Sequence, residues 1–383
     1  MNILARQGNS AASTVTYRHG QPGMKNDNPI LRIANLSKHY GEFEALSDVS
    51  LDIGKGEFVT LLGPSGSGKT TLLNIISGAL FPSSGALFLE GRDITHLPAR
   101  MRGIGMVFQN FALMPHLSVF ENIAFPLRIR KVPNNEVKDR VSEALELIKL
   151  PGIENRKPKQ LSGGQQQRIA IARALVYRPP LILMDEPLGA LDRKLRQQMQ
   201  FEIKRIHDDL GLSMIYVTHD QEEALTMSDR ICLMGGGKIR DIGAPGRIYA
   251  NPSSVFSADF FGATNIFSGS ATNRDNSKGV HHETFGLVRT GPTTVPDGQK
   301  VGWMVRPERL RFLAAGEVED NCLEGSISEV ILSGQVTQFL VDVGGGHMFN
   351  VACLTSDRIG ALTVGEQVRI GWPRHATSLL EPE

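Results

Sequence analysis

Several features that define other classes of protein are scarce or missing in this sequence. Cysteine occurs only three times in 383 residues, without the close pairs that hold zinc or build a disulfide framework, which fits a reducing cytosol. No apolar run approaches the roughly 18–20 residues of a membrane-spanning helix. The chain has 41 basic and 40 acidic residues, so no basic excess is available to neutralise nucleic-acid phosphates. These absences argue against a disulfide-stapled protein, a membrane-spanning protein and a nucleic-acid binder.

The chain divides into three segments that differ in amino-acid composition and hydrophobic pattern. Residues 1–28 are polar and lack the apolar stretch of a secretory signal, so we expect a disordered tail. Residues 29–262 alternate short apolar runs with helical patterns, which predicts an α/β domain whose sheet is covered by helices. Residues 263–383 carry closely spaced strand-like runs with Gly-rich turns, which predicts a small all-β, OB-like barrel. Its strands are expected at Gly302–Val305, Leu310–Leu313, Leu323–Leu332, Val336–Val343, Met348–Cys353 and Gln367–Trp372, with long loops within Arg274–Lys300.

The strongest chemical signal is a glycine-rich loop that matches G-x-x-x-x-G-K-[ST]. It follows an apolar strand at Phe58–Leu62 and opens a helix, and it consists of Gly63, Pro64, Ser65, Gly66, Ser67, Gly68, Lys69 and Thr70. The glycines permit positive φ, so backbone N–H groups can converge on phosphate oxygens at a helix N-terminus. Lys69 can reach the β- and γ-phosphates, and the Thr70 hydroxyl can ligate Mg²⁺. The alternative, a purely structural turn, is disfavoured because the loop lies directly between a strand and a helix.

A second signal is a pair of carboxylates, Asp185 and Glu186, directly after the apolar run Leu181–Met184. The run predicts a buried parallel strand whose carboxyl end lies at the edge where such sheets bind ligands. Asp185 can hold Mg²⁺ through water, and Glu186 can polarise an attacking water as a general base. Alone, this pattern also fits an ordinary strand end; together with the phosphate loop it predicts nucleotide hydrolysis.

A third signal is the sequence Leu161-Ser162-Gly163-Gly164-Gln165 before a helical pattern over residues 166–177. Ser162 and Gln165 fit a capping box, which is the purely structural explanation. However, each glycine in the first helical turn costs roughly 1 kcal/mol in helix propensity, and a cap does not require them. Two glycines would let a phosphate approach the helix N-terminus closely.

In this order and spacing, the three motifs resemble the ATP-binding cassette (ABC) ATPase family over about Ile30 to Phe261. The five-residue signature at Leu161–Gln165 is specific, because other phosphate-loop ATPases lack it. The resemblance implies a P-loop NTPase core with a helical subdomain at about residues 110–178. It also implies ATPase activity, with ATP and Mg²⁺ bound.

The resemblance assigns roles to further residues that match motifs of the family. Tyr40 resembles the aromatic residue that stacks on adenine, Gln109 the glutamine that senses Mg²⁺ and the attacking water, and His219 the switch histidine that contacts the γ-phosphate. Asp192 matches the loop that communicates between two ATP sites. The family usually has Ser where this chain has Gly189, which puts in doubt a hydrogen bond from this position across a dimer. Without the resemblance, Tyr40 would be interpreted as a packing residue, Gln109 as a solvated side chain and His219 as a structural histidine.

The implied site has three sets of residues. The catalytic set is Glu186, His219, Gln109 and Lys69. The nucleotide-binding set is Tyr40, Gly63, Pro64, Ser65, Gly66, Ser67, Gly68, Lys69, Thr70, Thr71, Ser162, Gly163, Gly164, Gln165 and Asp192. The metal-binding set is Thr70, Gln109 and Asp185.

The resemblance also implies partners. The expected assembly is a homodimer of ATPase subunits, in which the signature of one chain binds ATP held by the phosphate loop of the other. Two integral-membrane permease subunits would contact Phe111–Leu117 near Gln109, and a periplasmic or extracellular solute-binding protein would deliver the solute. The chain would then lie on the cytoplasmic face of the plasma (inner) membrane as a peripheral subunit.

The C-terminal segments Gly262–Phe267 and Met304–Glu308 resemble the TOBE-type barrel appended to ATPases of binding-protein-dependent importers. Together with Arg193–Gln200 and Thr218–Arg230, they are most similar to polyamine (putrescine/spermidine) importers. Relatives that import ferric iron, sulfate, sugars or glycerol phosphate share these segments, so the solute stays open among them. A non-transport ABC ATPase is the alternative class, but this chain has a single core and no sustained heptads.

Overall fold

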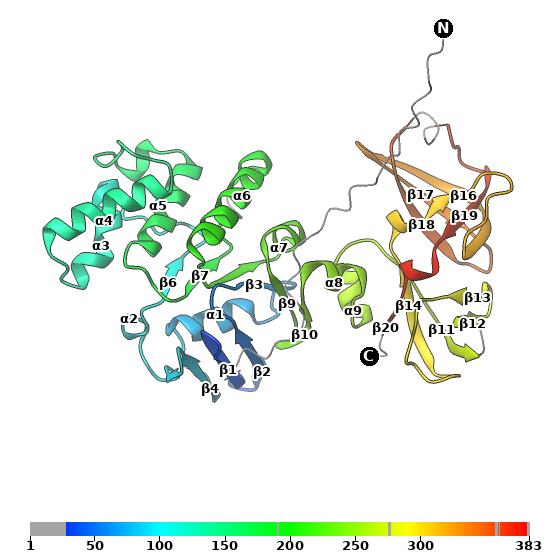
Figure 1. Cartoon of the computed structure of the whole chain (residues 1–383), viewed down its shortest axis with the longest axis horizontal. Coiled ribbons are helices and arrows are strands. Elements are labelled where there is room, and N and C mark those ends of the chain that lie inside the picture. Colours follow the sequence, from blue (N-terminus) through cyan, green and yellow to red (C-terminus); the bar gives the residue numbers. More distant parts are fainter. Residues whose placement is uncertain (1–27, 190, 275–276, 357–358, 360, 381–383) are drawn as a thin grey trace, which may run out of the picture.

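A computed structural model describes residues 28–380 except 190, 275–276, 357–358 and 360 (Figure 1). The disordered tail predicted at residues 1–28 therefore lies outside the described residues, apart from Asn28. Among the described residues, no helix is long and apolar enough to cross a membrane.

A six-stranded sheet lies at the centre of the N-terminal part, in the order β10-β9-β3-β8-β7-β6. All neighbouring strands are parallel except the pair β9 and β10, which is antiparallel. The strands are β3 (Phe58–Leu62), β6 (Gly105–Val107), β7 (Ile182–Asp185), β8 (Met214–Thr218), β9 (Arg230–Gly235) and β10 (Lys238–Gly243). Every residue of β3 and β8 is buried, as expected for strands that are covered on both faces.

A second, antiparallel sheet has the order β2-β1-β4-β5. Its strands are β1 (Leu31–Tyr40), β2 (Phe43–Ile53), β4 (Ser84–Leu89) and β5 (Arg92–Asp93). The helix α1 (Lys69–Ser77) packs between this sheet and the central one, because its apolar residues belong to a core cluster formed by both sheets. Since α1 begins at the end of the phosphate loop, this packing fixes the position of the loop.

Helices cover the central sheet and form a separate layer (Figure 1). The helices α3 (Val119–Ile129), α4 (Asn134–Leu147) and α5 (Gly163–Leu175) share a core of their own. We propose that this layer is the helical subdomain predicted at about residues 110–178. The helix α6 (Arg193–Leu210) packs on the central sheet through a cluster that includes Phe58 and Tyr216, and α7 (Gln221–Met227) follows β8. The helix α2 (Ala99–Arg102) is short.

The C-terminal part is all-β and follows the helices α8 (Pro245–Ala250) and α9 (Val255–Phe260). One sheet has the order β13-β12-β11-β14-β20 and the other β15-β19-β16-β17-β18. Both contribute to one core around Trp303, Phe349 and Trp372. The strands are β11 (Asn265–Arg274), β12 (Ser277–His282), β13 (Gly286–Arg289), β14 (Lys300–Val305), β15 (Arg311–Phe312), β16 (Asn321–Ser333), β17 (Val336–Asp342), β18 (Met348–Leu354), β19 (Gln367–Trp372) and β20 (Thr377–Leu380).

The segment Arg274–Lys300 includes a long loop at residues 290–299, as expected, but it also carries β12 and β13, which the sequence pattern did not predict. These strands are short and rich in Gly, His and Lys, which have weak strand propensity. Burial of Val280 and Val288 in the shared core stabilises them instead. The two strands also approach closely, since a Cβ on Gly279 would lie 2.2 Å from Val288 O.

Candidate nucleotide-binding and hydrolytic site

The predicted catalytic segments converge at one edge of the central sheet. The phosphate loop follows β3, His219 follows β8, the Asp185–Glu186 pair ends β7, and Gln109 lies two residues beyond β6. These four strands are adjacent and parallel. Their carboxyl ends therefore meet at the edge where open α/β sheets bind ligands.

The phosphate loop has the backbone geometry that its glycines permit. Gly63, Gly66 and Gly68 have φ angles of 153°, 77° and 100°. A Cβ would lie 2.3 Å from Met234 O at Gly63 and 2.8 Å from Ala45 O at Gly68, whereas Gly66 faces open space. Packing therefore requires glycine at the two ends of the loop, and its middle stays accessible to a ligand.

Two polar side chains of the loop could bind an anion. Lys69 Nζ donates to Gly63 O at 2.8 Å and to Pro64 O at 2.9 Å. Burial lowers the pKa of Lys69, while the nearby carboxylates Glu186 and Asp185 act in the opposite direction. The Ser67 hydroxyl is buried and has no hydrogen-bond partner among the described residues. A phosphate group would supply partners to both the amine and the hydroxyl.

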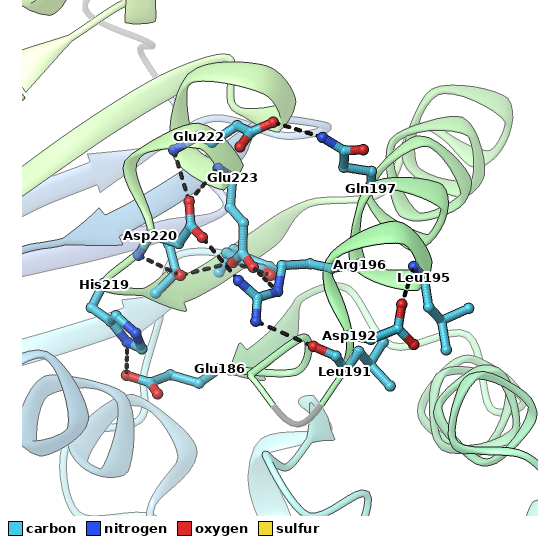
Figure 2. A network of polar contacts seen from close by, with 12 residues as sticks. Glu186, Leu191, Asp192, Leu195, Arg196, Gln197, His219, Asp220, Glu222 and Glu223 are labelled. Atoms are coloured by element: carbon cyan, nitrogen blue, oxygen red, sulfur yellow. Dashed lines mark hydrogen bonds and ion pairs between the residues drawn. The ribbon is translucent and has the colours of Figure 1, made fainter. Parts of the chain in front are cut away.

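The acidic pair lies beside the histidine at the end of the next strand. Glu186 has a φ of 42°, and its N–H donates to Val217 O at 3.0 Å. Its Oε1 lies 3.2 Å from Nδ1 of His219 (Figure 2), whose side chain is 64% exposed. Burial raises the pKa of Asp185, as does repulsion by Glu186, and Lys69 opposes both. A cation at this point would relieve that repulsion.

Gln109 is exposed and lies near the segment that follows Glu186. A Cβ on Gly189 would be 3.7 Å from Gln109 Nε2 and 3.5 Å from Glu186 O, which are ordinary contact distances. The backbone therefore has room for the serine that the family usually carries here. The departure at Gly189 removes a side chain without changing the packing of this segment.

The signature residues start α5 as a capping box. Gln165 N donates to Ser162 Oγ at 3.4 Å, and Ser162 N donates to Gln165 Oε1 at 3.0 Å. The two glycines also have a packing role that the sequence did not reveal. A Cβ on Gly163 would lie 3.4 Å from Leu191, and one on Gly164 would lie 3.1 Å from Leu195.

Several residues of the predicted nucleotide-binding set make no polar contact with the phosphate loop within the described part of one chain. No hydrogen bond or ion pair in the described part of the chain links Ser162–Gln165 to the phosphate loop. Tyr40, at the end of β1, is 50% exposed, and Lys38 Nζ lies 5.3 Å from its ring centroid. Asp192 caps α6, accepting from Leu195 N at 3.0 Å. At the end of the phosphate loop itself, Thr70 is exposed, and the next residue, Thr71, is half-buried.

Sequence reasoning missed a polar network behind the acidic pair (Figure 2). Arg196 on α6 makes an ion pair with Asp220, the residue after His219, at 3.3 Å and a longer one with Glu223 at 3.9 Å. Asp220 and Glu223 have the spacing of an ordinary helix start. That spacing gives no sign that the side chain of Glu223 is buried against β8.

The donor set around the acidic pair fits a magnesium–nucleotide complex. The Asp185 carboxylate interacts electrostatically with the Lys69 amine, Thr70 follows Lys69 in the chain, and the Gln109 amide lies beyond the end of the strand next to that of Asp185. The described residues contain no group of three or more His, Cys, Asp or Glu side chains that could hold a metal ion by themselves. Mg²⁺ in nucleotide sites is bound by one or two protein oxygens together with phosphates and water, so a sparse set of this kind suffices.

Comparisons with known proteins identify the family and the domains of this chain. The family model for ABC transporters matches residues 46–189, and the model for the TOBE domain matches residues 303–380. A spermidine/putrescine import ATP-binding protein, PotA, of Rubrobacter xylanophilus is 45% identical over 371 residues, which cover 95% of this chain and 97% of the relative. The protein of the same name in Vibrio cholerae is 41% identical, over 90% of this chain and 92% of the relative.

Solved structures match the N-terminal part. The dimeric bacterial ABC transporter cassette MJ0796 is 38% identical, with a TM-score of 0.51, over 56% of this chain and 98% of that one. The protein cbiO1 of Clostridium perfringens, part of the ABC transporter complex cbiONQ, is 29% identical, with a TM-score of 0.54, over 58% of this chain and 91% of that one.

Proposed function

The chain belongs to the ABC transporter family, and we propose that it is the ATP-hydrolysing subunit of a polyamine importer. The observation that carries the hydrolytic part is the pairing of Glu186 with His219 at 3.2 Å, on neighbouring strand ends beside the phosphate loop. The polyamine part rests on relatives named as spermidine/putrescine import proteins that align with at least nine-tenths of this chain.

We propose that the phosphate loop binds the triphosphate of ATP through its backbone N–H groups and Lys69. The buried amine and the orphaned Ser67 hydroxyl would gain phosphate partners. Tyr40 would stack on the adenine through its exposed ring. The remaining residues proposed to contact nucleotide are those predicted from the sequence: Gly63, Pro64, Ser65, Gly66, Gly68, Thr70, Thr71, Ser162, Gly163, Gly164, Gln165 and Asp192.

Thr70 and Asp185, with Gln109 beside them, would hold Mg²⁺. When bound, the ion would neutralise charge on the β- and γ-phosphates. The raised pKa of Asp185, which results from burial and from Glu186, supports a cation at this position.

Hydrolysis would use Glu186 as the group that orients and polarises the attacking water. Its backbone is held by the hydrogen bond to Val217, so its side chain projects beyond the strand end. His219 would contact the γ-phosphate while its Nδ1 faces Glu186. Lys69 would stabilise the charge that develops on the transferring phosphoryl group.

The active form would be a dimer, because the signature residues of one chain do not join its own phosphate loop. The exposed Ser162 at the start of α5 would complete the ATP site of a second copy. Two membrane-embedded permease subunits would bind at Phe111–Leu117, where Pro115 and His116 are exposed. With a solute-binding protein on the far side, this assembly would hold the chain at the cytoplasmic face of the membrane.

The hydrolytic role is tested by Glu186→Gln, which keeps the shape of the side chain and removes its charge. We expect kcat for ATP to fall by about 10²–10⁴-fold, the usual contribution of a general base, while ATP still binds. Glu146→Gln, an exposed carboxylate on α4, serves as the matched control and should retain full activity. Wild-type turnover in the Glu186→Gln protein would refute the assignment.

The solute is tested by uptake of labelled putrescine and spermidine in cells that lack the native subunit but contain the permease partners. The wild-type chain should restore uptake, and Glu186→Gln should not. A panel with ferric iron, sulfate, maltose and glycerol phosphate runs in parallel. Restored uptake of one of these in place of polyamine would overturn the solute assignment and leave the ATPase assignment intact.

A further inference from the structure

A partly buried ionic network joins two loops at the hydrolytic centre (Figure 2). One loop carries His219, and the other comprises residues 186–189 and 191–192, whose two parts are linked by the hydrogen bond from Leu191 N to Leu188 O at 3.1 Å. The network consists of Arg196, Asp220 and Glu223, with Tyr216 and Thr218 of β8. None of its three charged members belongs to the predicted site.

Arg196 contacts both loops at once. Its Nη2 donates to Leu191 O at 3.2 Å, in the loop that leads from Glu186 into α6. Its Nη1 donates to Asp220 Oδ2 at 3.3 Å, next to His219. Its Nε lies 3.9 Å from Glu223 Oε1, within ion-pair range. A planar guanidinium presents these donors in a rigid fork, so the two loops are held at a defined separation.

Glu223 anchors the network to the central sheet. It is only 3% exposed, and its Oε2 accepts from Tyr216 OH at 2.8 Å and from Thr218 Oγ1 at 2.7 Å. Burial is the largest influence on the pKa of Glu223 and raises it, with the hydrogen bonds from Thr218 and Tyr216 opposing. A carboxylate in this position needs a nearby cation, and Arg196 supplies it.

The same contacts fix the backbone on both sides of His219. Asp220 N donates to Thr218 Oγ1 at 3.0 Å, and Asp220 Oδ1 accepts from the N–H groups of Glu222 and Glu223 at the start of α7. The imidazole itself is largely exposed and faces Glu186. Its direction is therefore set by its anchored neighbours rather than by packing of its own ring.

Through Leu191, the network is also linked to α5, the helix that begins at the signature residues Ser162–Gln165. Leu191 and Leu195, on either side of the α6 cap, lie in contact range of Gly163 and Gly164. A shift of the Leu191 segment would therefore disturb the start of α5 as well as the segment beside Glu186.

We propose that Arg196 and Glu223 are positioning residues for ATP hydrolysis, which hold His219 and the Leu191–Asp192 segment at a fixed separation. This proposal rests on the hydrolytic roles proposed above for Glu186 and His219. Neither Arg196 nor Glu223 has a hydrogen bond or ion pair to the phosphate loop in the described part of the chain. Their loss is expected to lower turnover far more than the affinity for ATP, which would change only through the Leu191 segment and the start of α5.

The chain offers a matched control on the same pair of helices. Gln197 Nε2 donates to Glu222 Oε1 at 3.2 Å and joins α6 to α7 as Arg196 does. This bond is exposed and touches neither loop. If hydrolysis required only that α6 and α7 be linked, Gln197→Ala would lower kcat as much as Arg196→Ala. The positioning role predicts that Arg196→Ala lowers kcat and that Gln197→Ala does not.

The experiment measures steady-state ATP hydrolysis by the full-length chain, with thermal melting of each variant recorded in parallel. Arg196→Ala should lower kcat by about 100-fold, the scale of a catalytic group displaced by about 1 Å, with KM for ATP within about threefold of wild type. Arg196→Lys keeps the charge near Asp220 and Glu223 and should restore part of the lost kcat. Gln197→Ala should retain wild-type kcat.

Glu223→Gln provides a second variant should Arg196→Ala fail to fold. It keeps an acceptor for Tyr216 and Thr218 but removes the charge that pairs with Arg196, and it should lower kcat with KM unchanged. The proposal is overturned if the folded variants keep wild-type kcat, if only KM changes, or if Gln197→Ala loses as much activity as Arg196→Ala.

The failure of this proposal can be distinguished from failure of the proposed function. If Glu186→Gln abolishes turnover while Arg196→Ala and Glu223→Gln are fully active, only the positioning role is wrong. If Glu186→Gln is itself fully active, the hydrolytic assignment fails, and the positioning role fails with it.

Discussion

Arg173 on α5 donates hydrogen bonds to a strained turn at Phe111 and Ala112. Replacing Arg173 tests how much these bonds contribute to the free energy of unfolding. Its Nη1 donates to Ala112 O at 2.6 Å and its Nη2 to Phe111 O at 2.7 Å. Phe111 and Ala112 have φ angles of 61° and 47°, in the left-handed region that residues other than glycine avoid. The turn directly follows Gln109 and Asn110, so Arg173 ties the Gln109 segment to α5.

The expected cost of Arg173→Met follows from two opposing effects. Each hydrogen bond from a charged donor contributes roughly 1.5–3 kcal/mol. Each non-glycine residue in the left-handed region costs roughly 1–2 kcal/mol, part of which is recovered when the turn relaxes. The free energy of unfolding should therefore fall by about 2 kcal/mol. Ala112→Gly should raise it by about 0.5–1 kcal/mol, because glycine adopts this φ without strain.

The two substitutions should also be coupled. Once Arg173 is replaced, the turn relaxes by itself, so Ala112→Gly should gain less in the Arg173→Met background than in the wild type. The measurement is urea unfolding followed by far-ultraviolet circular dichroism. Tryptophan fluorescence would report on the wrong region, since both tryptophans, Trp303 and Trp372, lie in the C-terminal sheets.

The control is Arg128→Met, which removes an exposed ion pair with Glu121 on α3. Exposed pairs of this kind contribute about 1 kcal/mol or less, so this variant should unfold almost as the wild type does. The reasoning is refuted if Arg173→Met costs no more than the control, or if Ala112→Gly destabilises the protein.

Three further predictions concern single buried or strained residues. Arg102 is buried and donates to carbonyls that include Ile75 O and Ile76 O at the end of α1; Arg102→Met should cost about 3 kcal/mol in urea unfolding, since these acceptors lose charged donors. Lys149 is exposed with a φ of 57° after α4; Lys149→Gly should raise the melting temperature by relieving about 1 kcal/mol of strain. Burial acts to raise the pKa of Asp241, but hydrogen bonds led by that from Arg247 hold it below its usual value. The stability that this carboxylate adds is therefore present above about pH 4 and lost as the pH falls through its lowered pKa, so Asp241→Asn should destabilise at pH 7 and converge with the wild type in acid unfolding.

The predicted family and fold class are confirmed, since the relatives cover most of the chain and the C-terminal part is all-β. The strand expected at Phe58–Leu62 agrees residue for residue, because a short, largely apolar run is typical of a strand buried on both faces. By contrast, β12 and β13 were missed. Their sequence is weak in strand propensity, and their stability comes from neighbouring strands and the shared core.

The chemistry expected of this chain could be predicted from short sequence motifs. The phosphate loop, the acidic pair and the histidine each follow a short apolar run, and parallel strands bring such ends to one edge of a sheet. Local pattern is sufficient there, because each motif depends on residues adjacent in the chain. The contacts that hold these motifs in place could be identified only in the folded chain, because they join residues far apart in the sequence. Arg196 meets Glu223 across 27 residues and Arg173 meets Phe111 across 62, and a charged residue on an amphipathic helix gives no sign of its partner until the chain has folded.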